Sequence, residues 1–185
     1  VKNFIFSNSS SIYGGTNGDP NKETDPMLPI SPYARSKTMI EMILKDYEQA
    51  YSNMKFVSLR YFNAAGADPD SQCGYTQDPP GHLVPIVVQR ALADETVPVF
   101  GTDYPTKDGT AERDYTHVYD IARAHINAMN YLDDGNESAA FNLGAGKPFS
   151  VKEVISAVEK ETGKTISVFL ENARQGDPAK TWADI

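Results

Sequence analysis

Cysteine and clustered positive charge are nearly absent from this sequence of 185 residues. Because Cys73 is its single cysteine, no internal disulfide can form, and a reducing compartment such as the cytoplasm is expected. The formal net charge is −8 and no block of Lys or Arg stands out, so nucleic acid is not expected as a partner. The three histidines and the cysteine show no metal-ligand spacing, so the sequence predicts no metal site.

Long apolar runs are missing as well. No stretch approaches the roughly 20 residues of a membrane-spanning helix, so no membrane partner is expected. The opening residues, VKNFIFSNSS, have no basic region followed by a long apolar core, which argues against a signal peptide. They begin inside a strand pattern, and the chain stops at TWADI, so we expect a piece of a longer protein.

Strand and helix patterns alternate along the chain, which is typical of an α/β fold. Apolar stretches predict strands at residues 3–6, 55–62, 97–101, 139–146 and 165–171, the last of these being the final strand. Apolar residues at helical spacing predict helices at residues 33–51, 82–94, 118–134 and 150–163. The last helix begins with a Ser150–Glu153 capping box and ends at Gly163.

The first helix carries a tyrosine and a lysine at its N-terminal end. Pro32 suits the first helical position, and Ser31 can cap the free amides. Tyr33 and Lys37 share a helix face, and a nearby ammonium lowers the pKa of a phenol from about 10, which makes a base. The pair alone also fits a solvated first turn. Ser9 makes the pattern more specific, because it follows a buried strand, and α/β sheets bind ligands beyond the carboxyl ends of their strands.

Six stretches of the sequence resemble the extended short-chain dehydrogenase/reductase family, and within it the nucleotide-sugar 4-epimerases. They are FIFSNSSSIYG, SPYARSK, LRYFNAAGADPD, VFGTDYPTKDGTAERDYTHVYDIA, FNLGAG and RQGDPAKTWAD. They stand in family order and run from Phe4 to Asp184, nearly the whole chain. The resemblance implies the C-terminal part of a Rossmann-type parallel sheet domain at residues 1–62. A smaller α/β substrate-binding domain would follow at 63–185, with segments near 114–145 returning to the first domain.

The resemblance also implies an activity, NAD-dependent epimerisation at C4 of UDP-hexoses through a 4-keto intermediate. The catalytic residues would be Ser9, Tyr33 and Lys37. The residues near the cofactor would be Ser7, Tyr33, Lys37, Tyr61 and Phe62. The residues near the substrate would be Ser9, Asn63, His82, Leu83, Phe100, Arg113, Arg174, Asp177 and Thr181.

Several of these roles are distinct within the family. The resemblance implies that Asn63, Arg113 and Arg174 contact the UDP diphosphate, and a guanidinium fork does match phosphate oxygens bidentately. It implies that Phe100 lines the uracil pocket and that Asp177 holds the uridine ribose. The glycine-rich turn that binds NAD in this family has no counterpart here, so the 185-residue chain is expected to bind NAD weakly or not at all.

The sequence departs from the family pattern in two places. Gly81 and His82 stand where many epimerases have two asparagines, which puts the role of His82 in doubt. Thr181 stands where some members have a bulky tyrosine, which favours acceptance of UDP-N-acetylglucosamine and UDP-N-acetylgalactosamine as well. Two other functions compete with the 4-epimerase. Ser10 and Ser11 replace the Asp-Glu pair of the 4,6-dehydratases, which argues against a dehydratase or decarboxylase, whereas a catalytically inert UDP-sugar-binding fragment stays open.

The remaining features have plainer interpretations. His117 is expected to make a structural hydrogen bond, and His125 to be a core or surface residue of its helix. NLGAG lacks the P-loop lysine pattern and is expected to be a tight turn near the ligand. The apolar stripe of Met39, Ile43 and Tyr47 suits either a homodimer interface, as such helices form in this family, or ordinary core.

Overall fold

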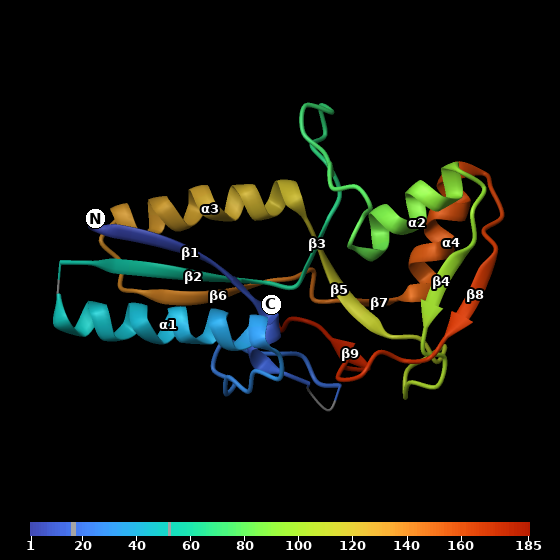
Figure 1. Cartoon of the computed structure of the whole chain (residues 1–185). Helices are drawn as coiled ribbons and strands as arrows, with labels where there is room; N and C mark the ends of the chain where they lie inside the picture. The colour runs from blue at the N-terminus through green and yellow to red at the C-terminus, as the bar shows by residue number, and fades with distance from the viewer. Residues whose placement is uncertain (16–17, 52) are drawn as a thin grey trace.

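A parallel sheet between two helices forms one half of the molecule in the computed structural model, which describes residues 1–15, 18–51 and 53–185 (Figure 1). The sheet has the order β1-β2-β6, from β1 (Asn3–Ser9), β2 (Lys55–Tyr61) and β6 (Ala139–Leu143). Helix α1 (Pro32–Ala50) covers one face and α3 (Val118–Asp133) the other (Figure 1). Val57 and Leu59 of β2 pack against Ala128 and Leu132 of α3. The predicted α/β class, with a Rossmann-type parallel sheet, is confirmed.

The other half contains a second, smaller α/β layer. Strands β4 (Val97–Phe100) and β8 (Val168–Glu171) pair in parallel, and α2 (Leu83–Leu92) packs against α4 (Val151–Thr162) beside them (Figure 1). Its core contains Val87, Val99 and Ile155. The predicted capping box is present, because the Ser150 hydroxyl accepts from the Glu153 amide at 3.1 Å and the Glu153 carboxylate accepts from the Ser150 amide at 2.8 Å.

Four short strands join the two halves, and none of them was predicted. They are β3 (Asn63–Ala65), β5 (Glu112–His117), β7 (Pro148–Ser150) and β9 (Lys180–Thr181). Strand β5 lies in the middle and pairs with each of the others. Its sequence, ERDYTH, buries the charged residues Glu112 and Asp114, so it has no apolar pattern to detect. The prediction that 165–171 is the final strand was wrong, since β9 follows it.

Helix α1 begins where the sequence predicted. The Ser31 hydroxyl accepts a hydrogen bond from the Ala34 amide at 3.1 Å, and Pro32 is the first helical residue. A short 3₁₀ helix, η1 (Ser10–Tyr13), follows β1, so Ser9 is the last residue of that strand and not, as predicted, a residue just beyond it.

The apolar stripe of α1 faces away from the core. The exposed fractions of Met39, Ile43 and Tyr47 are 58%, 61% and 46%. The expectation that they form ordinary core is therefore wrong for the chain as described. None of the helices in the described residues is long and apolar enough to cross a membrane.

Candidate active site

The predicted serine, tyrosine and lysine lie at one end of the parallel sheet. Ser9 ends β1, and the N-terminal end of α1, with Tyr33 and Lys37, lies beside the carboxyl end of that strand (Figure 1). The Lys37 ammonium donates to the Ser7 carbonyl at 2.8 Å and lies 5.7 Å from the centre of the Tyr33 ring. Tyr33 is half exposed, and the Ser9 hydroxyl accepts from the Ser11 amide at 3.2 Å. The helix therefore carries its phenol and its cation to the strand end where Ser9 stands.

A polar cluster around Ser7, the residue that holds Lys37, includes His125, which the sequence had suggested was an ordinary core or surface residue. The Tyr61 hydroxyl donates to the Ser7 hydroxyl at 2.8 Å, and His125 Nε2 lies 2.8 Å from the same Tyr61 oxygen. His125 Nδ1 donates to the Ile121 carbonyl at 2.9 Å, so Nε2 can only accept. Its donor is the Ser7 hydroxyl at 3.2 Å, because the one proton of the Tyr61 hydroxyl is donated to Ser7. Burial raises the pKa of Tyr61, against the opposing effect of the Ser7 hydrogen bond. Helical spacing placed His125 on α3, but only the fold brings it to Tyr61.

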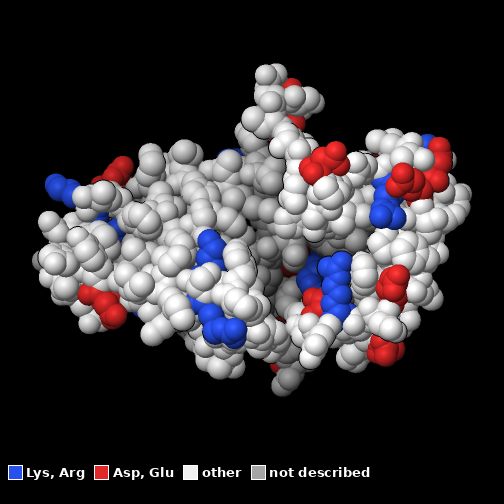
Figure 2. Space-filling model, in the orientation of Figure 1, with Lys and Arg blue, Asp and Glu red and all other residues white. Residues whose placement is uncertain are grey.

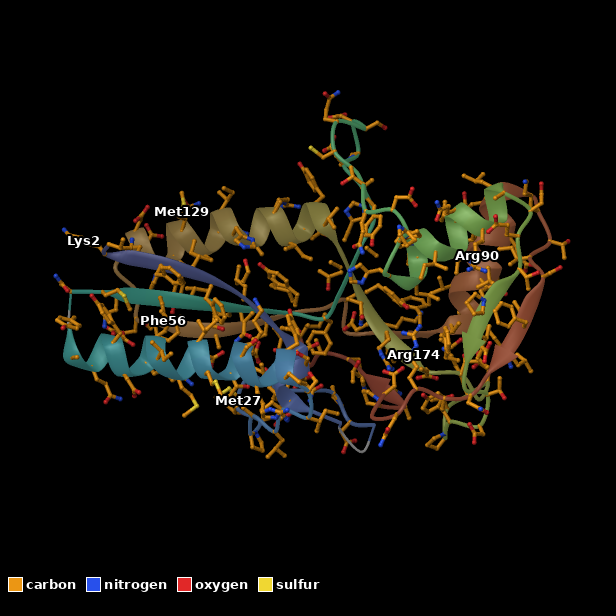
Figure 3. All side chains as sticks on the ribbon, viewed as in Figure 1. Lys2, Met27, Phe56, Arg90, Met129 and Arg174 are labelled. Carbon is orange, nitrogen blue, oxygen red and sulfur yellow. The ribbon has the colours of Figure 1, made fainter. Side chains whose placement is uncertain are left out.

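Most of the predicted substrate residues line one pocket of about 220 Å³ between the two halves. They are Asn63, His82, Leu83, Phe100, Arg113, Arg174 and Asp177. The Arg174 guanidinium stacks 4.0 Å from the centre of the Phe100 ring, and Figure 3 shows Arg174 in the smaller half of the molecule, near β5. Arg113 donates to the Asp177 carboxylate at 2.6 Å. Figure 2 shows charged side chains of both signs inside the hollow between the two halves.

A second pocket, of about 250 Å³, adjoins the first at two shared residues. It is lined by Ser9, Phe62 and Thr181, among others, and it shares Asn63 and Arg113 with the first pocket. Ser31, the cap residue of α1, also lines it. The two pockets thus meet at the guanidinium of Arg113 and the side-chain amide of Asn63. Thr181 lines the same pocket as Ser9.

Tyr115 lines the first pocket and was not predicted, because it stands on the undetected strand β5. Burial raises the pKa of Tyr115 to about 12, against the opposing charge of Arg113. Its backbone pairs with that of Asn63, and the Asn63 side-chain amide donates to the Asp114 carbonyl at 3.1 Å. The pairing of β5 with β3 therefore fixes the positions of Arg113 and Tyr115 relative to Asn63.

Asp114 is a buried carboxylate that ties the NLGAG segment to the C-terminal residues. It accepts from the Ala145 amide at 2.7 Å and from the Gly146 and Ala183 amides at 3.1 Å each. A Cβ atom on Gly144 would lie 2.4 Å from the Asp114 carboxylate, so this turn needs glycine. NLGAG thus ends in a tight turn, as predicted. Asp114 connects this turn to Ala183, two residues after Thr181.

Two other predicted features can be placed. His117 caps α3, because its Nδ1 accepts from the Tyr119 amide at 3.1 Å, so the expected structural hydrogen bond is confirmed. His82 precedes α2 and makes an edge contact with the Tyr75 ring, 6.0 Å between centres. Across the part of the chain that the structure describes, there is no group of three or more His, Cys, Asp or Glu that could hold a metal ion.

Comparisons with known proteins agree on one family. Residues 1–144 match the model of the NAD dependent epimerase/dehydratase family. A UDP-glucose 4-epimerase from Lacticaseibacillus casei is 47% identical over 180 residues, which cover 97% of this chain and 54% of that protein. The chain therefore spans about half the length of the curated relatives it matches.

Two solved structures show the same architecture. The structure of UDP-glucose 4-epimerase from Bifidobacterium longum in complex with NAD⁺ and UDP has a TM-score of 0.91 and 38% identity, over 100% of this chain and 56% of that one. The structure of the UDP-Glc/GlcNAc 4-epimerase from Campylobacter jejuni has a TM-score of 0.78 and 43% identity, again over 100% of this chain and 56% of that one.

Proposed function

Because the chain belongs to the NAD dependent epimerase/dehydratase family, we propose that the whole protein is an NAD-dependent epimerase that inverts C4 of UDP-glucose and UDP-galactose. The observation that carries the proposal is the pair of adjoining pockets, which share Asn63 and Arg113. One pocket has the groups that suit a nucleotide, and the other leads to Ser9.

The first pocket suits UDP. Arg113 and Arg174 bind the diphosphate, since guanidinium groups match phosphate oxygens, and Asn63 adds an amide donor between the two pockets. The base lies against Phe100, and the Asp177 carboxylate accepts from the ribose hydroxyls. Because the 185-residue chain has a net charge of −8, these two arginines provide local positive charge against the field of the rest of the chain.

The second pocket holds the sugar. Tyr33 takes the proton of the 4′-hydroxyl beside Ser9, and the Lys37 ammonium lies 5.7 Å from the centre of the Tyr33 ring. The 4-keto sugar turns over within the space bounded by Ser9, Phe62 and Thr181. After the sugar has turned over, its opposite face is presented at C4, and Tyr33 returns the proton to the 4′-oxygen.

When bound, NAD supplies hydride acceptance and return at C4. The residues that would hold its nicotinamide end are Ser7, Tyr61 and Phe62, at or just after the ends of β1 and β2, and Lys37 of α1. The cluster of Ser7, Tyr61 and His125 fits this role, since it presents hydroxyls to a polar ring substituent and orients them by hydrogen bonds. The Lys37 ammonium, fixed on the Ser7 carbonyl, suits the nicotinamide ribose.

A 4,6-dehydratase or decarboxylase is the less favoured candidate. Removal of water at C5 and C6 needs an acid and a base beside the sugar, and Ser10 and Ser11 line the second pocket where a carboxylate pair would be needed. An inert UDP-sugar-binding fragment is disfavoured by the presence of Ser9, Tyr33 and Lys37 together.

The proposal also covers the division into two domains, the dimer and the cellular compartment. Residues 1–62 with α3 and β6 form the cofactor side, and the remainder of 63–185 forms the UDP-sugar side. Two copies pair through the exposed face of α1, which presents Met39, Ile43 and Tyr47, and the protein works in the cytoplasm. The single, exposed Cys73 suits that reducing compartment.

The test is direct. The full-length protein is incubated with NAD and UDP-galactose, and the product is separated from the substrate. We expect UDP-glucose to form until both sugars reach a constant ratio. Absence of UDP-glucose, or formation of a 4-keto-6-deoxy sugar nucleotide, would contradict the proposal.

A further inference from the structure

A buried polar network lies directly beneath Ser9 and connects it to α1. Asn8 precedes Ser9 and is 1% exposed, and Glu41 of α1 is 0% exposed. The Asn8 amide donates to Glu41 Oε2 at 2.7 Å and to the Ser58 hydroxyl at 3.0 Å. Asn8 Oδ1 accepts from the Ser9 amide at 2.8 Å. A chain of hydrogen bonds thus runs from the helix through one side chain to the backbone of Ser9.

The orientation of the Asn8 amide is set by this environment. A flipped amide would place its oxygen against the Glu41 carboxylate and its NH₂ against the Ser9 amide, so both contacts would become repulsive. The carboxylate is itself held on both oxygens. Arg60 Nη2 lies 2.5 Å from Glu41 Oε1, and Arg60 Nε lies 3.1 Å from Glu41 Oε2.

The network also has a fixed relation to the other two predicted catalytic residues. Tyr33, Lys37 and Glu41 follow one another at intervals of four on α1, so they share one face of the helix. Lys37 is tied to the Ser7 carbonyl at 2.8 Å, and Glu41 is tied to Asn8. Successive helical turns are therefore attached to successive residues of β1, which sets the position of Tyr33 relative to Ser9.

We propose that Asn8 and Glu41 are positioning residues that fix the Ser9 hydroxyl relative to the Tyr33 phenol. The proposal rests on the proposed function of Ser9 and Tyr33 in proton transfer. A shift of about 1 Å in such a pair costs on the order of 100-fold in rate. A buried ion pair such as Glu41–Arg60 is weak support for stability, so the geometry that it imposes is the effect to measure.

The test uses Asn8→Ala and Asn8→Asp in the full-length holoenzyme. In Asn8→Ala the Ser9 amide loses its acceptor, and we expect a 10- to 100-fold loss of kcat per bound NAD. KM for UDP-galactose and the Kd for UDP should stay within about threefold, because no residue of the network lines the pocket of Phe100 and Arg174. A purely structural role would lower Tm and leave kcat per bound NAD unchanged.

Asn8→Asp gives a second readout. A protonated Asp at position 8 copies asparagine, since its O–H donates to Glu41 and its C=O accepts from Ser9, whereas an ionised one opposes Glu41. The charged and titratable groups around this position are Glu41, Lys37 and Lys45 of α1, Arg60 of β2 and Tyr13 of η1. We expect the ratio of Asn8→Asp to wild-type kcat to rise as the pH falls from 8 to 6 and to exceed that of Asn8→Ala. If Asn8→Ala does not fold, the pH dependence of Asn8→Asp tests the positioning role of Asn8 in its place.

The control is Lys45→Ala, which removes a partner of the same carboxylate from its solvent side, 3.1 Å from Glu41 Oε1, without touching Asn8. We expect its kcat to equal that of wild type. Hydrogen exchange of the Ser9 amide gives a readout independent of activity, and Asn8→Ala should remove its protection while the amides of Ile5 and Phe6 stay protected. Wild-type kcat per bound NAD in Asn8→Ala, or unchanged protection of Ser9, would overturn the positioning role. A wild-type enzyme that ignores UDP-galactose would instead overturn the proposed function, and the exchange readout would still decide the positioning role.

Discussion

At the residue scale, the three cationic side chains of the predicted site are each held in position by a neighbouring group. Lys37 is anchored on the Ser7 carbonyl, Arg113 on Asp177, and Arg174 on the face of Phe100. A lysine or arginine loses considerable rotamer entropy when it binds an anion, and an anchored side chain has already lost part of it. The site is therefore partly ordered before any ligand arrives.

Tyr33→Phe in the full-length protein should abolish epimerisation and leave UDP binding intact. The change removes only the phenolic oxygen that accepts the proton, and loss of a general base costs on the order of 10²–10⁴ in kcat. Tyr33 does not line the pocket that contains Phe100 and Arg174, so the Kd for UDP should not change. Steady-state kinetics and calorimetric titration check the two statements. Tyr47→Phe, the same change on the same helix, is the control. Near-normal turnover of Tyr33→Phe would contradict the assignment of Tyr33 as the group that accepts the proton.

Thr181→Tyr should narrow the substrate range. Thr181 lies in the pocket of Ser9, and Lys180 is directed elsewhere, toward Glu112 and the Trp182 ring. Because a tyrosine would fill the space that a 2′-N-acetyl group needs, kcat/KM for UDP-N-acetylgalactosamine should fall about 10- to 200-fold. The value for UDP-galactose should change little, and Thr181→Ser should behave like wild type. The idea fails if wild type does not accept the acetylated pair or if the tyrosine variant keeps that activity.

At the scale of elements, a buried ion pair joins α1 to β2, and a hydrogen bond from Asn8 joins β1 to the same carboxylate. Glu41 receives hydrogen bonds from Asn8, Ser58 and Arg60, and Arg60 also donates to the Tyr13 hydroxyl at 2.7 Å. Burial by itself would raise the pKa of the Glu41 carboxyl, but the hydrogen bonds and charge of Arg60, with the Ser58 hydroxyl, lower it to about 2. The helix, both strands and η1 thus share one charged contact.

Acid should loosen this contact. Since the folded pKa of Glu41 lies below its unfolded value, its contribution to the free energy of unfolding is present above about pH 5 and is lost as the pH falls toward 2. Relative to the protonated carboxyl, this pH-dependent part is on the order of 3 kcal/mol at pH 7. The net effect of the buried pair is smaller, because removing both charges from water costs free energy. Urea unfolding of wild type and Glu41→Gln at pH 7, 5, 4 and 3 should show a stability difference that shrinks with acid. Glu48→Gln on the same helix is the control, and a difference independent of pH would contradict the expectation.

At the scale of the whole molecule, the two halves leave different surfaces exposed. The cleft between them contains the charged pocket, while the outer face of α1 is apolar, with Met39, Met42, Ile43 and Tyr47 exposed. An apolar face of this kind on a helix is typical of an interaction surface. It is separate from the face of α1 that carries Lys37 and Glu41 to β1.

We expect Ile43→Glu in the full-length protein to convert a dimer into a monomer. A charge placed in the centre of an apolar interface cannot find a partner there, and leaving it buried would cost several kcal/mol. Light scattering at micromolar concentration measures the mass. Ile126→Glu on α3, where Ile126 is similarly exposed, is the matched control. A wild-type protein that is monomeric under these conditions would contradict the proposed interface.

The site was predicted from sequence in two ways, because the spacing of Tyr33 and Lys37 is a local pattern, whereas the pocket residues, Asn63 and Arg113 among them, followed from the family resemblance. Ser31 and Pro32 mark the start of α1, and the interval between Tyr33 and Lys37 places them on one helix face. These features depend on backbone geometry within a few residues, which sequence alone determines. The alternation of strands and helices, and hence the α/β class, follows from the same kind of local pattern.

Only the tertiary structure decided which distant polar residues meet. Strand β5 has no apolar pattern, and it forms because β3, β7 and β9 satisfy its backbone groups. Glu41 and Arg60 look like surface residues in sequence, and His125 looks like an ordinary helical residue. A charge or an imidazole becomes buried when its partners arrive from other elements, and no local spacing encodes that arrival. The sequence by itself thus determined the class of fold and the Tyr33–Lys37 pair, while the packing of α1, α3 and β5 decided what surrounds them.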